Sequence, residues 1–224
     1  MPMRRARYGS ARTDGTNRRA AGCAAMSKAK REKAAEPLLE IDRTARDLFK
    51  PYKGSPPIKV LGWFAQAGDQ LQLRVLCGGV LAIGLARRDP RMVRAAARML
   101  LSHELATLAK RAVKNRVDRW RPHSAGAGKP VKPRKGRSKA KARNSFPSGH
   151  SAGAMAVACA FAAEYPGQRG AALAAGGAIS AAQVPTSSHY PSDVVAGAAI
   201  GVATDSAVGL VWRAAERLWR RWTA

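Results

Sequence analysis

The chain has 224 residues, the length of one ordinary domain with room for a tail. Its 40 Lys and Arg residues outnumber 14 Asp and Glu, giving a formal net charge of +26. Such a balance indicates an anionic partner: nucleic acid, an anionic membrane surface or a phosphorylated substrate. Three cysteines without metal-ligand spacing exclude a disulfide framework and a cysteine-based metal site.

Residues 1–36 are rich in Lys and Arg and lack a periodic apolar pattern, which predicts a disordered basic tail. No apolar segment follows the basic start, so no signal peptide is expected. Met26 opens a Met-Ser-Lys-Ala-Lys stretch, and we expect it to be the true start of translation.

Residues 37–57 read as an amphipathic helix and a linker. Apolar residues at helical spacing occupy residues 37–50, which favours a helix packed on the protein or lying at a membrane surface. Gly54-Ser-Pro-Pro57 then breaks the pattern.

Residues 58–224 form the predicted main domain, with a basic loop over 123–145. Strand signals are nearly absent, so we predict an all-α fold: a membrane helical bundle of about five to six helices. A weak apolar segment covers residues 58–67. The five clear helical segments are expected at 71–87, 92–120, 147–164, 169–184 and 191–220.

Three segments with one ionisable residue each are long enough to span a bilayer: 144–163, 170–192 and 194–212. Their apolar character comes mainly from Ala and Gly, so a soluble Ala-rich bundle is the alternative. Small residues such as Gly197 and Gly201 let helix backbones approach closely. Tryptophans among arginines near the C-terminus resemble an interfacial belt, which favours the membrane.

Lys114 and Arg121 are the first candidate binding residues. Seven residues make nearly two helical turns, so the spacing predicts both side chains on one helix face, about 10 Å apart. Pro122 disfavours helix at Arg121 and is expected to end the segment. A guanidinium and an ammonium suit a phosphate group, although a solvated basic face is the alternative.

Pro147-Ser148-Gly149-His150 is the second motif, at the start of a predicted helix. We expect the free N–H groups of Ser148 and Gly149, the Ser148 hydroxyl and the helix dipole to bind an anion. His150 would then be placed as a general acid. An ordinary helix start with a capping histidine is the alternative.

His189-Tyr-Pro-Ser-Asp193 is the third motif. Its spacing of four lets the carboxylate orient one ring nitrogen and present the other as a base or nucleophile. A polar loop with Asp193 as a helix cap is the alternative.

In combination the motifs resemble the type 2 phosphatidic acid phosphatase (PAP2) superfamily, which includes vanadium haloperoxidases and bacterial class A acid phosphatases. Its pattern is Lys-x6-Arg-Pro, Pro-Ser-Gly-His and Ser-Arg-x5-His-x3-Asp, and the resemblance covers roughly residues 60–213. The resemblance implies catalysis by His189, His150 and Asp193 through a phosphohistidine, without a metal or other cofactor.

The resemblance also implies that Lys114, Arg121, Ser148 and Gly149 hold the phosphoryl oxygens. The expected Ser-Arg pair falls on Ala182 and Gln183, so Gln183 replaces the third cation. Losing such a donor typically costs about 3–4 kcal/mol. The chain is then a slow enzyme, an enzyme that takes a cation from the 129–143 loop, or a binding protein derived from an enzyme.

We therefore expect a phosphatase for a lipid phosphomonoester or diphosphate of the phosphatidate, phosphatidylglycerophosphate or polyprenyl phosphate type. The expected partners are that substrate and the membrane, with no specific nucleic acid. The alternative is a weakened relative that binds lipid phosphates or nucleic acid. By analogy with membrane members of the family, we place the chain in the inner membrane, multi-pass, with the site on the outer face.

Overall fold

The computed structural model describes residues 33–125 and 131–222. The chain divides into two units, residues 1–40 and 41–224, and the description below concerns the second. The predicted tail and Met26 lie almost wholly outside the described residues. Residues 33–36, which the tail prediction included, are helical and belong to a helix over 33–49.

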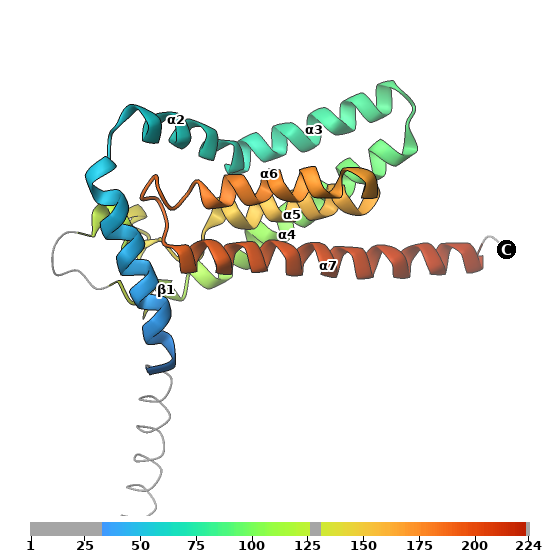
Figure 1. The fold of residues 1–224 in the computed structure, drawn as a ribbon. Coiled ribbons are helices and arrows are strands. Elements are labelled where there is room, and N and C mark those ends of the chain that lie inside the picture. The colour runs from blue at the N-terminus through green and yellow to red at the C-terminus, as the bar shows by residue number, and fades with distance from the viewer. Residues whose placement is uncertain (1–32, 126–130, 223–224) are drawn as a thin grey trace, which may run out of the picture. The chain divides into compact units, whose positions relative to one another are not determined.

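Helices dominate the described residues, as predicted (Figure 1). The α-helices after residue 49 are α2 (Pro56–Ala65), α3 (Gln70–Ala86), α4 (Pro90–Lys114), α5 (Gly149–Glu164), α6 (Arg169–Ala181) and α7 (Pro191–Trp222). Short 3-10 turns connect several of them, including η2 (Gln66–Gly68) between α2 and α3. The one described sheet is a two-residue antiparallel pairing of β1 (Val117–Asp118), which follows α4, with β2 (Arg134–Lys135) of the basic loop.

Helix starts follow local sequence signals. Asp69 caps α3 by accepting from the Gln70 N–H, and Asp89 caps α4 by accepting from Arg91 and Met92. Gly54 adopts a positive φ of 86° just before α2, at the predicted break. These caps fix where the helices begin and therefore which residues reach the bundle ends.

α5 is the central helix of the bundle and packs against α4, α6 and α7. Its buried face is mostly alanine, including Ala152 and Ala156. A Cβ on Gly197 would lie 2.4 Å from the Ser148 carbonyl oxygen, and one on Gly201 would lie 2.5 Å from that of Ala152. The two glycines therefore bring α7 into backbone contact with α5, which confirms the predicted close approach.

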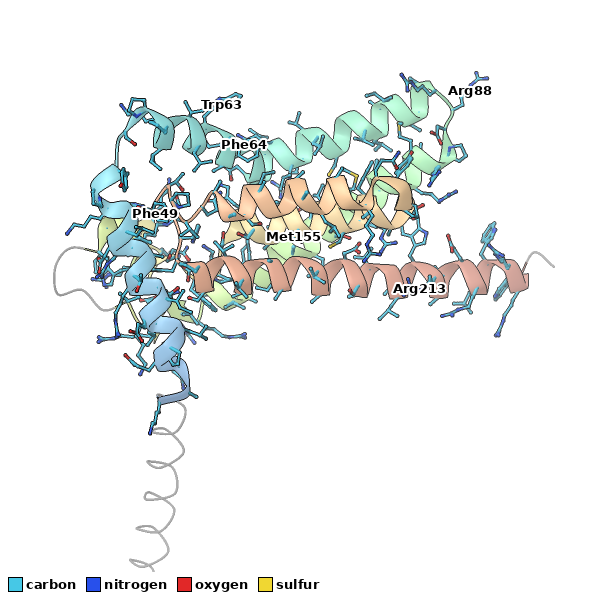
Figure 2. All side chains as sticks on the ribbon, in the orientation of Figure 1. Phe49, Trp63, Phe64, Arg88, Met155 and Arg213 are labelled. Carbon is cyan, nitrogen blue, oxygen red and sulfur yellow. The ribbon has the colours of Figure 1, made fainter. Side chains whose placement is uncertain are left out.

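One described helix, α7, is long and apolar enough to cross a membrane. The segment Pro56–Gly68 and α3 meet the same criterion together, although they are bent by 56°. Arginines lie at one end of the bundle: Figure 2 shows Arg88 at the turn between α3 and α4 and Arg213 on the C-terminal half of α7. Further basic side chains, including Lys114 and Arg121, lie at the opposite end. The other predicted site residues lie at that end too.

Candidate active site

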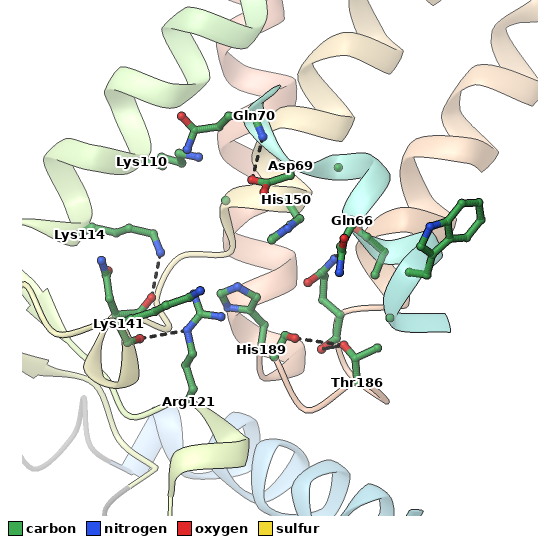
Figure 3. Close-up of a pocket in the computed structure, with 18 of the residues that line it drawn as sticks. Gln66, Asp69, Gln70, Lys110, Lys114, Arg121, Lys141, His150, Thr186 and His189 are labelled. Atoms are coloured by element: carbon green, nitrogen blue, oxygen red, sulfur yellow. Dashed lines mark hydrogen bonds between the residues drawn. The ribbon is translucent and has the colours of Figure 1, made fainter. Parts of the chain in front are cut away.

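A cavity of about 810 Å³ opens at the end of the bundle where α4 ends and α5 begins (Figure 3). Turn η2, the chain between α4 and α5, and the loop between α6 and α7 complete its wall. Residues far apart in sequence therefore share one space. Those predicted from sequence that line it are Lys114, Arg121, Gly149, His150, Gln183 and His189.

His150 and His189 face each other across this cavity, with ring centroids 6.4 Å apart. His150 occupies the first turn of α5, while His189 precedes α7 and is 1% exposed. Burial lowers the pKa of His189 to about 4, although the Asp193 carboxylate opposes that shift. His189 is therefore neutral at pH 7 and carries the free electron pair that a nucleophile needs.

Asp193 sits in the first turn of α7, with Oδ2 3.7 Å from His189 Nδ1. That distance allows electrostatic attraction but exceeds a hydrogen bond. The carboxylate is held instead by the Ser145 hydroxyl at 2.6 Å and the Tyr190 N–H at 3.0 Å, both on Oδ2. The predicted pairing is thus approximate in geometry, and Asp193 is rigidly placed by groups other than the histidine.

Arg119 completes this support, although it was not among the site residues predicted from the sequence. Its guanidinium is 2% exposed and donates to the Asp193 and Asp42 carboxylates and to the Val131 carbonyl. Asp42 also accepts from the N–H and hydroxyl of Ser192, at the start of α7. The only available signal was the placement of Arg119 beside the Arg121-Pro122 motif.

Lys114 and Arg121 both reach the cavity, but the predicted reason is wrong. α4 ends at Lys114 instead of continuing to residue 120, and Arg121 has extended backbone (φ −70°, ψ 147°). The chain leaves the helix because Val117 and Asp118 pair with β2, while Pro122 favours extended backbone at Arg121. The two cations therefore converge from a helix end and a loop.

Backbone carbonyls anchor both of these cations. Lys114 Nζ donates to the Asn144 carbonyl at 2.9 Å, and Arg121 Nε donates to the Lys141 carbonyl at 3.1 Å. Burial, followed by the charge of Arg121, lowers the pKa of Lys114 to about 7. Neither carbonyl neutralises its cation, so both charges remain available to an anion.

The expected anion cradle at the start of α5 is present only in part. The Ser148 N–H donates to the Asp193 carbonyl, so it is not free as predicted. The Ser148 hydroxyl is fully buried, accepts from the N–H and hydroxyl of Ser151, and caps the helix. Gly149 and His150 remain, because N–H groups in the first turn lack intrahelical acceptors.

Gln183, expected to contact phosphate, lines the cavity but is 2% exposed. Its Nε2 donates to the carbonyls of Ala65 at 3.2 Å and Ile179 at 3.4 Å. The amide donor is thereby committed to holding α6 against the end of α2. Gln183 brings no charge to the cavity and offers no free N–H in this arrangement.

The cavity wall also includes Lys110 and Asp69, which were not predicted from the sequence. Lys110 lies one helical turn before Lys114, and its side chain is directed toward Gly149. Asp69, the cap of α3, lies near His150. Burial lowers the pKa of His150, and the Asp69 carboxylate acts in the opposite direction. The i, i+4 spacing of Lys110 and Lys114 was the signal that could have found the lysine.

Comparison with known proteins identifies the family of the chain and a similar fold. The sequence model described as the PAP2 superfamily matches residues 95–218, more than half of the chain. The crystal structure of LpxE from Aquifex aeolicus is similar in fold, with a TM-score of 0.54 and 22% identity. The match covers 76% of this chain and 93% of LpxE. No curated protein sequence matches the chain.

Proposed function

Because the chain belongs to the PAP2 superfamily, we propose that it is a phosphatase that hydrolyses a lipid phosphate through a phosphohistidine. The observation that carries the proposal is the pair of histidines 6.4 Å apart across a cavity walled by cations. This separation accommodates one phosphoryl group in contact with both rings. The neutral, buried ring of His189 then acts as the nucleophile, and the ring of His150 at the start of α5 acts as the acid.

His189 attacks the phosphorus atom with Nε2, since Nδ1 faces Asp193. The bond from phosphorus to the leaving oxygen breaks as His150 donates its proton to that oxygen. Asp193 stabilises the positive charge that develops on the His189 ring. Lys114, Arg121 and the Gly149 N–H hold the phosphoryl oxygens, while Ser148 fixes the helix start.

Hydrolysis of the intermediate reverses these roles. His150, now neutral, accepts a proton from a water molecule, whose oxygen attacks phosphorus. The bond between phosphorus and His189 breaks, inorganic phosphate leaves, and both rings return to their starting states. Each proton and electron pair is accounted for by residues of the cavity and one water molecule.

An amphipathic substrate is supported by the walls of the cavity. Ile58, Gly62 and Trp63 of α2 line it opposite the cations of α4, and Trp63 is 77% exposed. An acyl or prenyl chain would contact α2 while its phosphate enters the cationic end. Phosphatidate, phosphatidylglycerophosphate and polyprenyl phosphates or diphosphates all have this form.

We place the chain in the inner membrane. The apolar helix α7 and exposed leucines on α4, such as Leu101 and Leu108, support contact with lipid. Arginines at the α3–α4 turn and near the end of α7 fit the cytoplasmic side. The site at the opposite end would then face the outer side, with several helices crossing the bilayer.

The test is release of inorganic phosphate from a panel of the three lipid classes in detergent micelles. Wild-type protein should turn over at least one of them, and His189→Ala should lose about 10⁴-fold in kcat at unchanged thermal stability. A wild-type protein that only binds these lipids would instead support the weakened-relative alternative. Equal turnover by wild type and His189→Ala would refute the mechanism.

A further inference from the structure

Lys110 is a buried cation without a salt bridge among the described residues, and the Asp69 and Glu104 carboxylates act on its charge only without direct contact. Its side chain is 6% exposed, and among residues 33–125 and 131–222 no carboxylate forms a salt bridge with it and no acceptor binds it. An isolated buried charge destabilises a folded protein, so such residues are usually paired. The partner of Lys110 is therefore expected to be a ligand.

The position of Lys110 points to an anion as that ligand. A Cβ added to Gly149 would lie 2.8 Å from Lys110 Nζ, so the ammonium lies against the glycine of the helix-start cradle. A side chain at residue 149 would require the ammonium group to move. Figure 3 shows Lys110 and Lys114 extending from α4 toward the space that also receives His150 and His189.

Spacing on α4 supports the same conclusion. Lys110 and Lys114 differ by one turn, about 6 Å along the axis, so their side chains share a face. Lys114 is tied to the Asn144 carbonyl, whereas Lys110 has freedom to follow a phosphoryl oxygen. Burial lowers the pKa of Lys110 to about 8, so the side chain still carries its proton at pH 7, and a bound dianion would raise that pKa again.

We propose that Lys110 is a phosphoryl-binding residue and supplies the third cation that Gln183 does not. The inference deepens the proposed phosphatase and rests on it. It also favours Lys110 over the 129–143 loop, which the sequence analysis suggested as the source of the missing cation. Lys141 of the basic loop lines the cavity too, but it is exposed, and a solvated lysine contributes less than a desolvated one.

The experiment compares Lys110→Met, Lys141→Met and Gln183→Arg, with Lys135→Met as a charge-matched control outside the cavity. Methionine keeps the length and helix preference of lysine. Turnover of micelles of the lipid phosphate that wild type hydrolyses best in the panel above, and inhibition by inorganic orthovanadate, are measured together with the melting temperature. Loss of turnover by wild type itself would be a failure of the proposed function, not of the role of Lys110.

Lys110→Met should lower kcat/KM about 10²–10³-fold and weaken vanadate inhibition by a similar factor. Its melting temperature should be unchanged or raised, since an unpaired buried charge is removed. Lys135→Met should stay within twofold. Gln183→Arg should change the wild type by less than tenfold and should restore Lys110→Met at least tenfold, because charge returns to the same cavity.

Three results would each overturn the assignment. The first is a Lys110→Met protein within threefold of wild type, and the second is a larger loss in Lys141→Met than in Lys110→Met. The third is a double variant no better than Lys110→Met. A loss of kcat/KM in Lys110→Met accompanied by a much lower melting temperature, without rescue in the double variant, would mark Lys110 as structural.

Discussion

The two ends of the bundle differ in whether their buried charged side chains form salt bridges. Away from the cavity, Arg98 of α4 donates twice to Asp205 of α7, at 2.9 and 3.0 Å, and Ser102 adds a third hydrogen bond. Every charge in this cluster has a partner within the protein. At the cavity, Lys110 and Lys114 come from the same α4, and neither forms a salt bridge with a carboxylate of the described residues.

This difference separates structural from functional charge. Paired ions join two helices and need no ligand, whereas unpaired cations keep their electrostatic potential for an anion. Arg119 stands between the two classes, because it is fully paired but contacts Asp193, which lies 3.7 Å from His189. It neutralises Asp42 and Asp193 and thereby fixes the orienting carboxylate.

The largest effect is expected from Arg119→Met. Two buried carboxylates lose their counter-charge, so the free energy of unfolding should fall by about 3–5 kcal/mol. Phosphate release should fall with it, because Asp193 loses a fixed partner. Chemical denaturation in micelles and turnover at low temperature measure both, with exposed Arg116→Met as the control. A stable, active Arg119→Met protein would contradict the account.

Arg98→Met tests the paired cluster at the other end. The unpaired Asp205 should lower the free energy of unfolding by about 2–3 kcal/mol, somewhat less because both side chains retain some exposure. Below the melting temperature kcat should be unchanged. Arg94, whose side chain is 47% exposed, serves as the control and should cost less than about 0.5 kcal/mol on substitution. A selective loss of kcat in Arg98→Met would erase the distinction between the ends.

pH should move activity and stability in opposite directions. The pKa of Lys114 is lowered to about 7 in the folded protein, against the ordinary lysine value of 10.5, so the unfolded chain binds more protons between these values. Stability without ligand should therefore rise with pH in this window, while kcat/KM falls as the cation is lost. Lys114→Arg should move the alkaline fall of kcat/KM upward, because arginine stays charged.

The acid limb of the dependence of kcat/KM on pH should reflect protonation of His189. Its pKa of about 4 predicts that kcat/KM falls tenfold per pH unit only below that value, as the nucleophile becomes protonated. A profile of kcat/KM with an acid limb near 6.5 would show that burial does not govern this ring. Lys135→Met provides a variant with unchanged limbs.

The smallest effect concerns the apolar wall. Trp63→Ala should raise KM for a long-chain lipid phosphate about five- to tenfold by removing apolar contact area, and should leave p-nitrophenyl phosphate unaffected. Phe64→Ala, on the same helix but absent from the cavity wall, is the matched control. Equal effects on both substrates would argue against a chain-binding role for α2.

Much of the fold was predictable, because local rules govern it. The expected helices at 71–87, 147–164 and 191–220 agree closely with α3, α5 and α7, where caps and apolar periodicity act within the helix itself. The prediction that the helix beginning near residue 92 reaches residue 120 was wrong. It ends at Lys114 because β1 pairs with β2, a contact with residues about 17 positions away that no local pattern records.

By itself the sequence determined the helical class, the family resemblance and the two histidines, since these depend on short motifs and composition. Only the tertiary structure decided how the charges are used. It paired Arg119 with two carboxylates, committed Ser148 and Gln183 to the fold, and left Lys110 unpaired beside Gly149. The physical reason is that the effect of a charge depends on its burial and its neighbours, and both are set by segments distant in sequence.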